Sequence, residues 1–239
     1  WGCKEERDRE LSRFRADSNR FSVSSFNLLA QAFMSRRIYP HLEHRHRKWC
    51  HRRANLREQI QAVNSDVLLL QEVDRWSEWS LVLEELGYGG QLYEQRPGRP
   101  DGCALVWKHD RFDLLRSDRI DLNDLADVTR SPRYNRDNVG VMAELRPHGG
   151  DTDSKASSGG GIVFATAHLF WNETHEEVKF MQALHVLARL REFCGGVAAD
   201  TTAGQRGNAS EPSEDRDGNT VPLMRADKKG TGETPNEGS

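Results

Sequence analysis

Three polar side chains at the ends of apolar, strand-like runs are the residues of this sequence best suited to phosphate chemistry. Asn27 ends FSVSSFN, Glu72 follows VLLLQ, and His168 follows IVFATA. A carboxylate is a hard oxygen ligand for Mg²⁺, which keeps water and substrate phosphate in its other positions. An imidazole beside a scissile phosphate can donate a hydrogen bond or a proton to the developing charge. Glu72 is therefore a candidate metal ligand, and His168 and Asn27 are candidate catalytic residues.

Each of these side chains also has a purely structural interpretation. Asn is common at strand ends and turns, where it bonds a nearby backbone group, so Asn27 could do only that. Glu72 could form an ion pair with Arg75 or another arginine, and His168 could be a core histidine that donates to a carbonyl. Considered singly, the three residues leave both interpretations open.

The strands that must position these side chains are indicated by hydrophobic patterns. FSVSSFN alternates, so Phe21, Val23 and Asn27 are expected on one core-facing side of a strand. The aliphatic run from Val67 to Leu70 is typical of a strand buried on both faces. Three more strands are predicted at residues 103–108, 138–145 and 162–169.

Helices are predicted between the strands. Spacings of four and three residues predict a helix through Leu56, Ile60 and Val63. A second helix is expected over residues 77–88, stopping at Gly87. A last helix follows from apolar residues at every third position: Val178, Met181, Leu184, Leu187 and Leu190. Alternating strands and helices indicate an α/β or α+β layered domain.

Composition limits the class of protein. The chain has 239 residues with 36% hydrophobic residues, enough for one domain with a core. With 34 Lys and Arg against 37 Asp and Glu, the net charge of −3 excludes a globally basic nucleic-acid binder. Four cysteines without C-x-x-C spacing indicate neither a zinc site nor a disulfide framework, which favours a reducing, intracellular and cytoplasmic setting. No apolar run approaches the roughly 18–20 residues of a membrane span.

The chain is uneven along its length. Residues 1–20 are interpreted as an N-terminal extension and residues 21–194 as the folded domain. The polar, glycine-rich stretch 150–161 suits an exposed loop. Residues 195–239 contain no Phe, Trp or Tyr, so a disordered tail is expected there.

A basic stretch over residues 36–57 holds eight Arg or Lys against one acid, Glu43. Tyr39 and Trp49 lie within it and could stack on bases while the arginines follow a phosphate backbone. The alternative is a solvated loop and helix face, with Trp49 anchored in the core near Leu56.

Five blocks together carry a family resemblance: FSVSSFNLLAQAF, LLLQEVD, RPDGCALVWKHDRFDLL, RDNVGVMAEL and ATAHLFWNETHEEVKFMQ. In this order they resemble the endonuclease/exonuclease/phosphatase superfamily, and more closely its carbon-catabolite-repressor deadenylase, Angel and nocturnin branch. The resemblance covers about residues 20–194. It implies a DNase I-like sandwich of two β-sheets flanked by helices, and magnesium-dependent cleavage of phosphodiester or phosphomonoester bonds.

The resemblance also assigns residues. It implies that Glu72 is the metal-ligating glutamate, that Asn27 touches metal-bound water or phosphate, and that His168 faces the phosphate. Asp101 and Asn138 fall in family blocks with weaker assignments. A Pro-Asp-Gly turn explains Asp101 almost as well, and Asn138 could simply cap or position a loop.

Two family segments do not occur in this sequence. The family places a Gly-Asp-x-Asn segment after the helix that follows the histidine strand, and a Ser-Asp-His segment farther on, and these orient the attacking water and lie close to metal and phosphate. The C-terminal half of the family fold is thus expected to be missing, with unpaired sheet edges and weak or no activity as a result. Glu173 stands where deadenylases carry a base-contacting proline, so an adenine preference does not transfer.

These observations leave three functions open. The first is a Mg²⁺-dependent phosphodiesterase, a 3′-exoribonuclease acting on RNA or poly(A), with deadenylation-complex proteins as possible partners. The second is a phosphatase acting on a nucleotide such as a dinucleotide phosphate. The third is a catalytically inactive RNA-binding or interaction protein, so the sequence leaves open whether this chain is an enzyme.

Overall fold

Two β-sheets form the centre of the fold in the computed structural model, which describes residues 20–148 and 161–200. The first sheet has the order β1 (Val23–Asn27), β2 (Val67–Val73), β4 (Gly102–Trp107), β3 (Gly90–Gln95). The second has the order β5 (Phe112–Asp121), β6 (Val139–Pro147), β7 (Ile162–Ala167). Only β1 and β2 pair in parallel among these strands; the other pairs are antiparallel.

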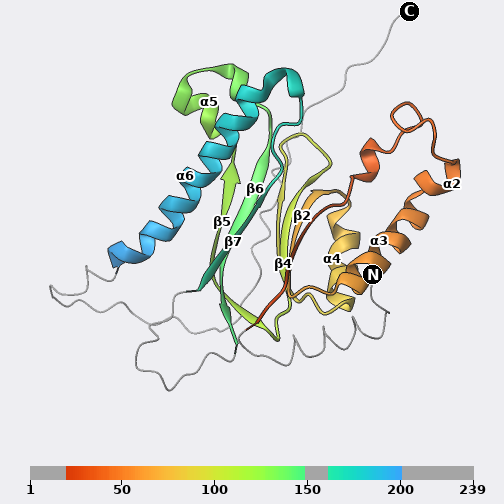
Figure 1. Ribbon diagram of the computed structural model, residues 1–239, viewed down its shortest axis with the longest axis horizontal. Helices are drawn as coiled ribbons and strands as arrows, with labels where there is room; N and C mark the ends of the chain where they lie inside the picture. The colour runs from red at the N-terminus through yellow and green to blue at the C-terminus, as the bar shows by residue number, and fades with distance from the viewer. Residues whose placement is uncertain (1–19, 149–160, 201–239) are drawn as a thin grey trace, which may run out of the picture. The chain divides into compact units, whose positions relative to one another are not determined.

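Helices cover the outer faces of both sheets (Figure 1). The long helices are α3 (Trp49–Val63), α4 (Trp76–Glu85) and α6 (Glu176–Asp200). Shorter ones are η1 (Gln31–Phe33), α2 (His44–Arg47), α5 (Asp124–Thr129), η2 (Pro132–Tyr134) and η3 (Glu173–His175). Figure 1 shows α3 and α4 on one side of the paired sheets and α6 on the other. This is the predicted α/β arrangement of two sheets flanked by helices.

The inner faces of the two sheets pack against each other through aliphatic and aromatic side chains. Val67 and Leu105 of the first sheet share a buried cluster with Val141 and Phe164 of the second. Phe21 joins this cluster edge-to-face with Phe164 at a centroid distance of 5.8 Å. Burial on both faces explains why β2 begins with an unbroken aliphatic run.

The outer faces form two further cores. Ile60 of α3 and Leu83 of α4 pack on Leu68 of β2, on the outside of the first sheet. On the outside of the second sheet, Leu190 of α6 packs against a cluster that contains Met142. The helices predicted through residues 56–63 and 77–88 are confirmed as α3 and α4.

The sequence patterns missed two strands, β3 and β5. Along β5 only Phe112 and Ile120 are buried, and the residues between them are mostly exposed, so no alternation is visible. In β3 every residue but the last is half-buried, which gives no contrast between faces. β3 is held by its pairing with β4, and β5 by its pairing with β6. Composition does not reveal such pairing.

The expectation that Phe21, Val23 and Asn27 share one core-facing side is wrong for Val23, which is 42% exposed, and for Asn27, which is also exposed. β1 lies at the edge of its sheet and pairs only with β2 among the described strands. Phe26, on the opposite face of the strand, packs against the α3 and α4 core instead.

The buried side of α6 also differs from the prediction. Leu184 and Leu187 are 44% and 61% exposed. The buried stripe runs instead through Val178, Gln182 and Val186 and on to Leu190. A repeat of three drifts around a helix that turns every 3.6 residues, whereas a repeat of four stays closer to one face.

The predicted boundary at residue 194 falls within α6, which extends to Asp200. Residues 1–19, 149–160 and 201–239 lie outside the described residues, and with them most of the predicted extension, loop and tail. Within residues 20–148 and 161–200, no helix combines the length and apolarity needed to cross a bilayer.

Candidate phosphate and metal site

A β-bulge near the end of β2 sets the direction of Glu72. The pairing of β2 with β4 shifts register between Leu70 and Val73. Glu72 lies inside this irregularity with φ of 51°, in the left-handed region that non-glycine residues rarely adopt. Bulges re-aim side chains and are frequent beside active sites. A strained backbone at the candidate ligand is therefore an observation that favours function at this position.

The structure brings Asn27, Glu72 and His168 together. Asn27 Nδ2 donates to Glu72 Oε1 at 2.7 Å, and His168 Nε2 lies 3.7 Å from the same oxygen. The side chains of Glu72 and His168 are 14% and 20% exposed, so they are sheltered but still reachable. A carboxylate oxygen that faces an amide and an imidazole at a sheltered rim is suited to binding a cation and a phosphoryl group.

Neighbouring strands explain this meeting. β1 and β2 run parallel with Asn27 opposite Gln71, so both strands end at the same edge. His168 comes from the second sheet, directly after β7. Gln71 Nε2 donates to Thr166 Oγ1 of β7 at 2.8 Å and so joins the two sheets beside the site.

The contacts of Arg75 and Asn27 test the purely structural interpretations of Glu72 and Asn27. Arg75 forms its ion pair with Glu78 at 2.7 Å, so it is not the partner of Glu72. The backbone-bonding role of Asn27 is present in addition to its contact with Glu72, because Asn27 Oδ1 accepts from Leu29 N at 2.8 Å. Both ends of the Asn27 amide are thus fixed, which sets its orientation.

Arg52 fixes the loop that follows Asn27. Its Nη2 donates to the carbonyl oxygens of Leu28 at 2.9 Å and Leu29 at 2.5 Å. Leu29 has φ of 55°, and Ala30 N donates to Glu72 Oε2 at 3.3 Å. Burial lowers the pKa of Arg52, and the nearby carboxylates of Asp74 and Glu72 act in the opposite direction.

Arg52 belongs to the basic stretch, and no sequence pattern indicated this positioning role. Arg52 was one of eight basic residues without a distinguishing feature of its own. The available signal was its helical spacing, three residues after Trp49 and four before Leu56, both of which pack on the core. Such spacing places Arg52 on the inward side of α3.

Asn138 supports His168 from behind. Its Nδ2 donates to the His168 carbonyl oxygen at 2.8 Å, and its Oδ1 accepts from Gln182 Nε2 at 3.1 Å. Gln182 is fully buried, and its Oε1 accepts from Phe170 N at 2.7 Å. Asn138 therefore positions the chain around His168, as its structural interpretation predicted, and Gln182 is a supporting residue that the sequence analysis missed.

Asp101 lies in the connection between β3 and β4 and is fully buried. Its Oδ2 pairs with Arg96 Nη1 at 3.4 Å. Arg96 Nε in turn donates to the carbonyl oxygen of Asp137 at 2.9 Å. The carboxylate of Asp101 thus faces an arginine that braces the segment before Asn138, a contact that the Pro-Asp-Gly turn did not predict.

Glu72 offers one carboxylate, a hard oxygen donor of the kind that divalent cations take. Mg²⁺ is usually held by one or two carboxylates together with water and substrate phosphate. Among the described residues, no group of three or more His, Cys, Asp or Glu is placed to hold a metal ion. The donors present therefore suit a site in which water and phosphate complete the coordination.

The basic stretch divides into two parts. In α3, Arg53 pairs with Glu78 of α4 at 3.2 Å and Arg57 with Glu85 at 3.5 Å. Trp49 packs edge-to-face on the Trp79 ring at 5.7 Å, so its predicted alternative as a core anchor is confirmed, and its base-stacking role stays a prediction. The residues before α3 have few acidic neighbours.

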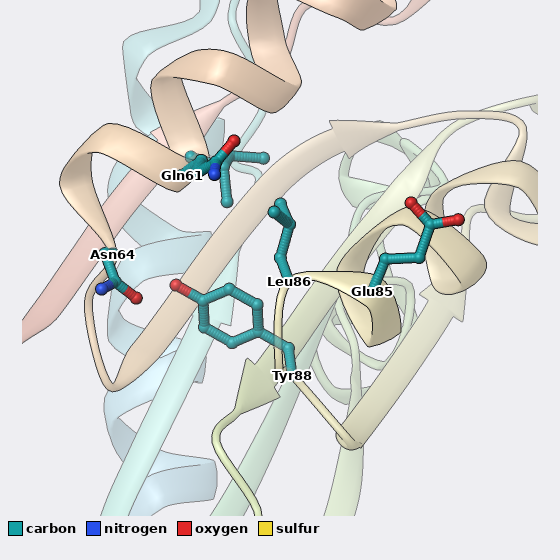
Figure 2. Close-up of a pocket in the computed structure, with 6 residues that line it drawn as sticks. Gln61, Asn64, Glu85, Leu86 and Tyr88 are labelled. Atoms are coloured by element: carbon teal, nitrogen blue, oxygen red, sulfur yellow. The ribbon is translucent and has the colours of Figure 1, made fainter.

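A separate hollow lies at the other end of β2 (Figure 2). It is lined by Ile60, Gln61, Asn64, Glu85, Leu86 and Tyr88. Asn64 precedes β2, whereas Glu72 is near its end, and eight residues of extended chain span about 25 Å. This hollow is distinct from the candidate site, and it contains one carboxylate and no imidazole.

Comparisons with known proteins agree with this geometry. Residues 24–196 match the Endonuclease/Exonuclease/phosphatase family. Protein angel homolog 2 of Bos taurus is 35% identical over 176 residues, covering 71% of this chain and 30% of the bovine protein. RNA exonuclease NGL2 of Saccharomyces cerevisiae is 31% identical over 180 residues, covering 73% and 35%.

Solved structures of related proteins are also similar to this chain. A crystal structure of ANGEL2, described as a 2′,3′-cyclic phosphatase, superposes with a TM-score of 0.60 at 32% identity, covering 72% of this chain and 48% of that chain. The human nocturnin catalytic domain gives 0.57 at 26% identity, covering 74% and 59%. The chain thus spans about a third of the length of the curated relatives and about half of these solved chains.

Proposed function

The chain belongs to the endonuclease/exonuclease/phosphatase family, in the branch of the carbon-catabolite-repressor, Angel and nocturnin proteins, and from this premise we propose that it hydrolyses phosphate esters of RNA with a divalent metal ion. Enzymes of this family generally use divalent metals. The proposal specifies Mg²⁺ as the ion and a 3′-exoribonuclease as the activity.

The observation that carries the proposal is the meeting of Asn27 and His168 at one oxygen of Glu72. Glu72 would hold the metal, since it is the carboxylate at this rim with both oxygens oriented by neighbours. A bound Mg²⁺ would supply a Lewis acid that polarises a phosphoryl oxygen. His168 Nε2 would donate a hydrogen bond to the charge on the phosphate, and Asn27 would orient water or a phosphoryl oxygen.

RNA is the substrate class favoured by one feature next to His168 and by one relative. Trp171 is 76% exposed three residues after His168, so its ring is available for stacking on a base. The yeast relative is an RNA exonuclease. Glu173 is also exposed and would repel nearby phosphates, so we extend the proposal to RNA and poly(A) without a preference for adenine.

We further propose that these 239 residues alone turn over substrate slowly. Neither a Gly-Asp-x-Asn nor a Ser-Asp-His segment occurs within them. Loss of one preorganised group from a polar active site typically lowers kcat by about 10²–10³. In this proposal Glu72 and His168 would hold metal and phosphate, but the segments that the family resemblance assigns to orienting the attacking water do not occur in these residues.

The test compares Glu72→Gln with Glu58→Gln, an exposed residue of α3. Mn²⁺ binding, followed by electron paramagnetic resonance as a probe of the Mg²⁺ site, is expected to weaken at least tenfold in Glu72→Gln only. Hydrolysis is measured on poly(A), on RNA ending in a 2′,3′-cyclic phosphate, and on a dinucleotide phosphate. Equal Mn²⁺ binding in the two variants would exclude Glu72 as the ligand. Cleavage of the dinucleotide phosphate alone would replace the exonuclease by the phosphatase alternative.

A further inference from the structure

The segment between β1 and α3 carries a pocket of basic residues outside the Glu72 site. Building on the proposed function, we infer that this pocket binds a backbone phosphate of single-stranded RNA and so makes the protein favour an oligonucleotide over a mono- or dinucleotide. The pocket is lined by Met34, Arg36, His44, Arg47 and Lys48. Its volume is about 540 Å³ and it opens to solvent, a size within the range of ligand pockets.

The charge of this pocket is largely uncompensated. Arg53 and Arg57 are neutralised by acids of α4, and Arg45 pairs with Glu43 at 2.9 Å. Arg36 and Lys48 are exposed and make no ion pair within residues 20–148 and 161–200. Exposed cations without acidic neighbours attract phosphate groups, and they release bound counterions when phosphate replaces them.

The pocket wall is held in shape by its own backbone. Arg47 Nη1 donates to the carbonyl oxygen of Tyr39 at 3.2 Å and also contacts that of Leu42. The Arg47 carbonyl oxygen accepts from Gln31 Nε2 at 3.0 Å. Arg47 therefore serves as a structural clasp, while Arg36 and Lys48 remain available for an anion.

Gln31 connects this pocket to the candidate site. Its Oε1 accepts from Arg52 Nη1 at 2.9 Å, and Arg52 binds the loop that follows Asn27. Met34 is five residues after Leu29, so the chain limits their separation to roughly 18 Å. An RNA strand with its 3′ end at His168 could thus place an upstream phosphate at the pocket. The one linking phosphate of a dinucleotide would lie at the proposed catalytic residues and would leave none for the pocket.

The test is a binding experiment with the full 239-residue chain in EDTA, so that hydrolysis plays no part. A fluorescent 12-nucleotide oligo(A) and a labelled dinucleotide are titrated at several salt concentrations by fluorescence anisotropy. The test variant is Arg36→Ala combined with Lys48→Ala. The control combines Arg146→Ala with Arg191→Ala, two exposed cations elsewhere in the fold.

Loss of this one phosphate contact should lower the salt slope of log K by about 0.7 and weaken 12-mer binding about fivefold near 0.1 M salt. The control variant should bind the 12-mer like the unaltered chain, and dinucleotide binding should not change. Unchanged affinity and salt slope in the test variant would overturn the inference, as would equal losses for 12-mer and dinucleotide. If the salt slope falls as expected but no substrate is cleaved, the proposed hydrolysis is wrong, while the inference that the pocket binds phosphate still holds.

Discussion

Asn27 Nδ2 donates to Glu72 Oε1 across 2.7 Å, although 45 residues separate the two in sequence. The parallel pairing of β1 and β2 explains the contact, because it places Asn27 level with the residue before Glu72. An amide at this position donates to Glu72 and fixes its rotamer, which is what a preorganised metal ligand requires.

Asn27→Asp should make stability depend on pH and on metal. A second carboxylate at hydrogen-bonding distance from Glu72 creates a pair in which one folded-state pKa is raised. The unfolded chain then ionises first as the pH rises above about 4, so the free energy of unfolding falls with pH, by about 1 kcal/mol or more at pH 7. Urea denaturation at pH 4 and pH 7 measures this, and Mn²⁺ should restore stability at pH 7. Asn55→Asp, on the exposed side of α3, should show neither effect.

Arg52→Lys should destabilise the protein, while Arg53→Lys should not. Arg52 bonds three acceptors through its planar fork, which a lysine ammonium cannot reproduce. Arg53 makes one exposed ion pair with Glu78 that a lysine can replace. We expect a loss of about 1–3 kcal/mol for Arg52→Lys and within about 0.5 kcal/mol for Arg53→Lys by urea denaturation. Equal small losses would mean that the loop after Asn27 holds its shape without Arg52.

Gln182→Met tests the buried support behind His168. The substitution keeps the volume but leaves Phe170 N and Asn138 Oδ1 without their partner. Unsatisfied buried polar groups cost about 1–3 kcal/mol in total here, and the His168 ring proton should shift in NMR spectra because Asn138 bonds the His168 carbonyl. Gln59→Met, on an exposed face of α3, serves as the control. A destabilised variant with unshifted His168 signals would limit Gln182 to a packing role.

The strand ends that carry the candidate site could be predicted from sequence, because an apolar run interrupted by a polar residue marks where a buried strand reaches the rim. This worked for Glu72 and His168. No sequence pattern predicted the left-handed backbone of Glu72, because this conformation arises from the register shift between β2 and β4. A bulge is set by two strands together.

The supporting residues were hidden for a related reason. Gln182 is buried in α6, but it is not a member of the apolar repeat at every third residue that predicted this helix. Its hydrogen-bond partners come from two other segments. Arg52 is one of several basic residues in its stretch, and only its contacts with backbone carbonyl oxygens distinguish it from the others. Local patterns indicate which residues are apolar or charged, but contacts between distant segments decide which polar residue is buried and bonded.

Glu144→Gln should flatten the acid dependence of stability. Arg116 Nε donates to Glu144 Oε2 at 2.6 Å and Gly161 N donates to Oε1 at 2.8 Å. The bond from Arg116, with a smaller contribution from Gly161, lowers the pKa of Glu144. A lowered folded-state pKa contributes stability that is present above the unfolded pKa of about 4.3 and is lost as the pH falls through the folded value.

Wild type should therefore exceed Glu144→Gln by about 1–2 kcal/mol at pH 6, and the gap should close toward pH 3. Urea denaturation between pH 3 and pH 6 measures the gap. Glu85→Gln is the matched control, because Glu85 pairs with Arg57 at 3.5 Å in an exposed setting and an exposed pair stabilises little. A gap that stays constant with pH would show that Glu144 acts through shape alone, since a titrating charge must lose its contribution once it is protonated in both states.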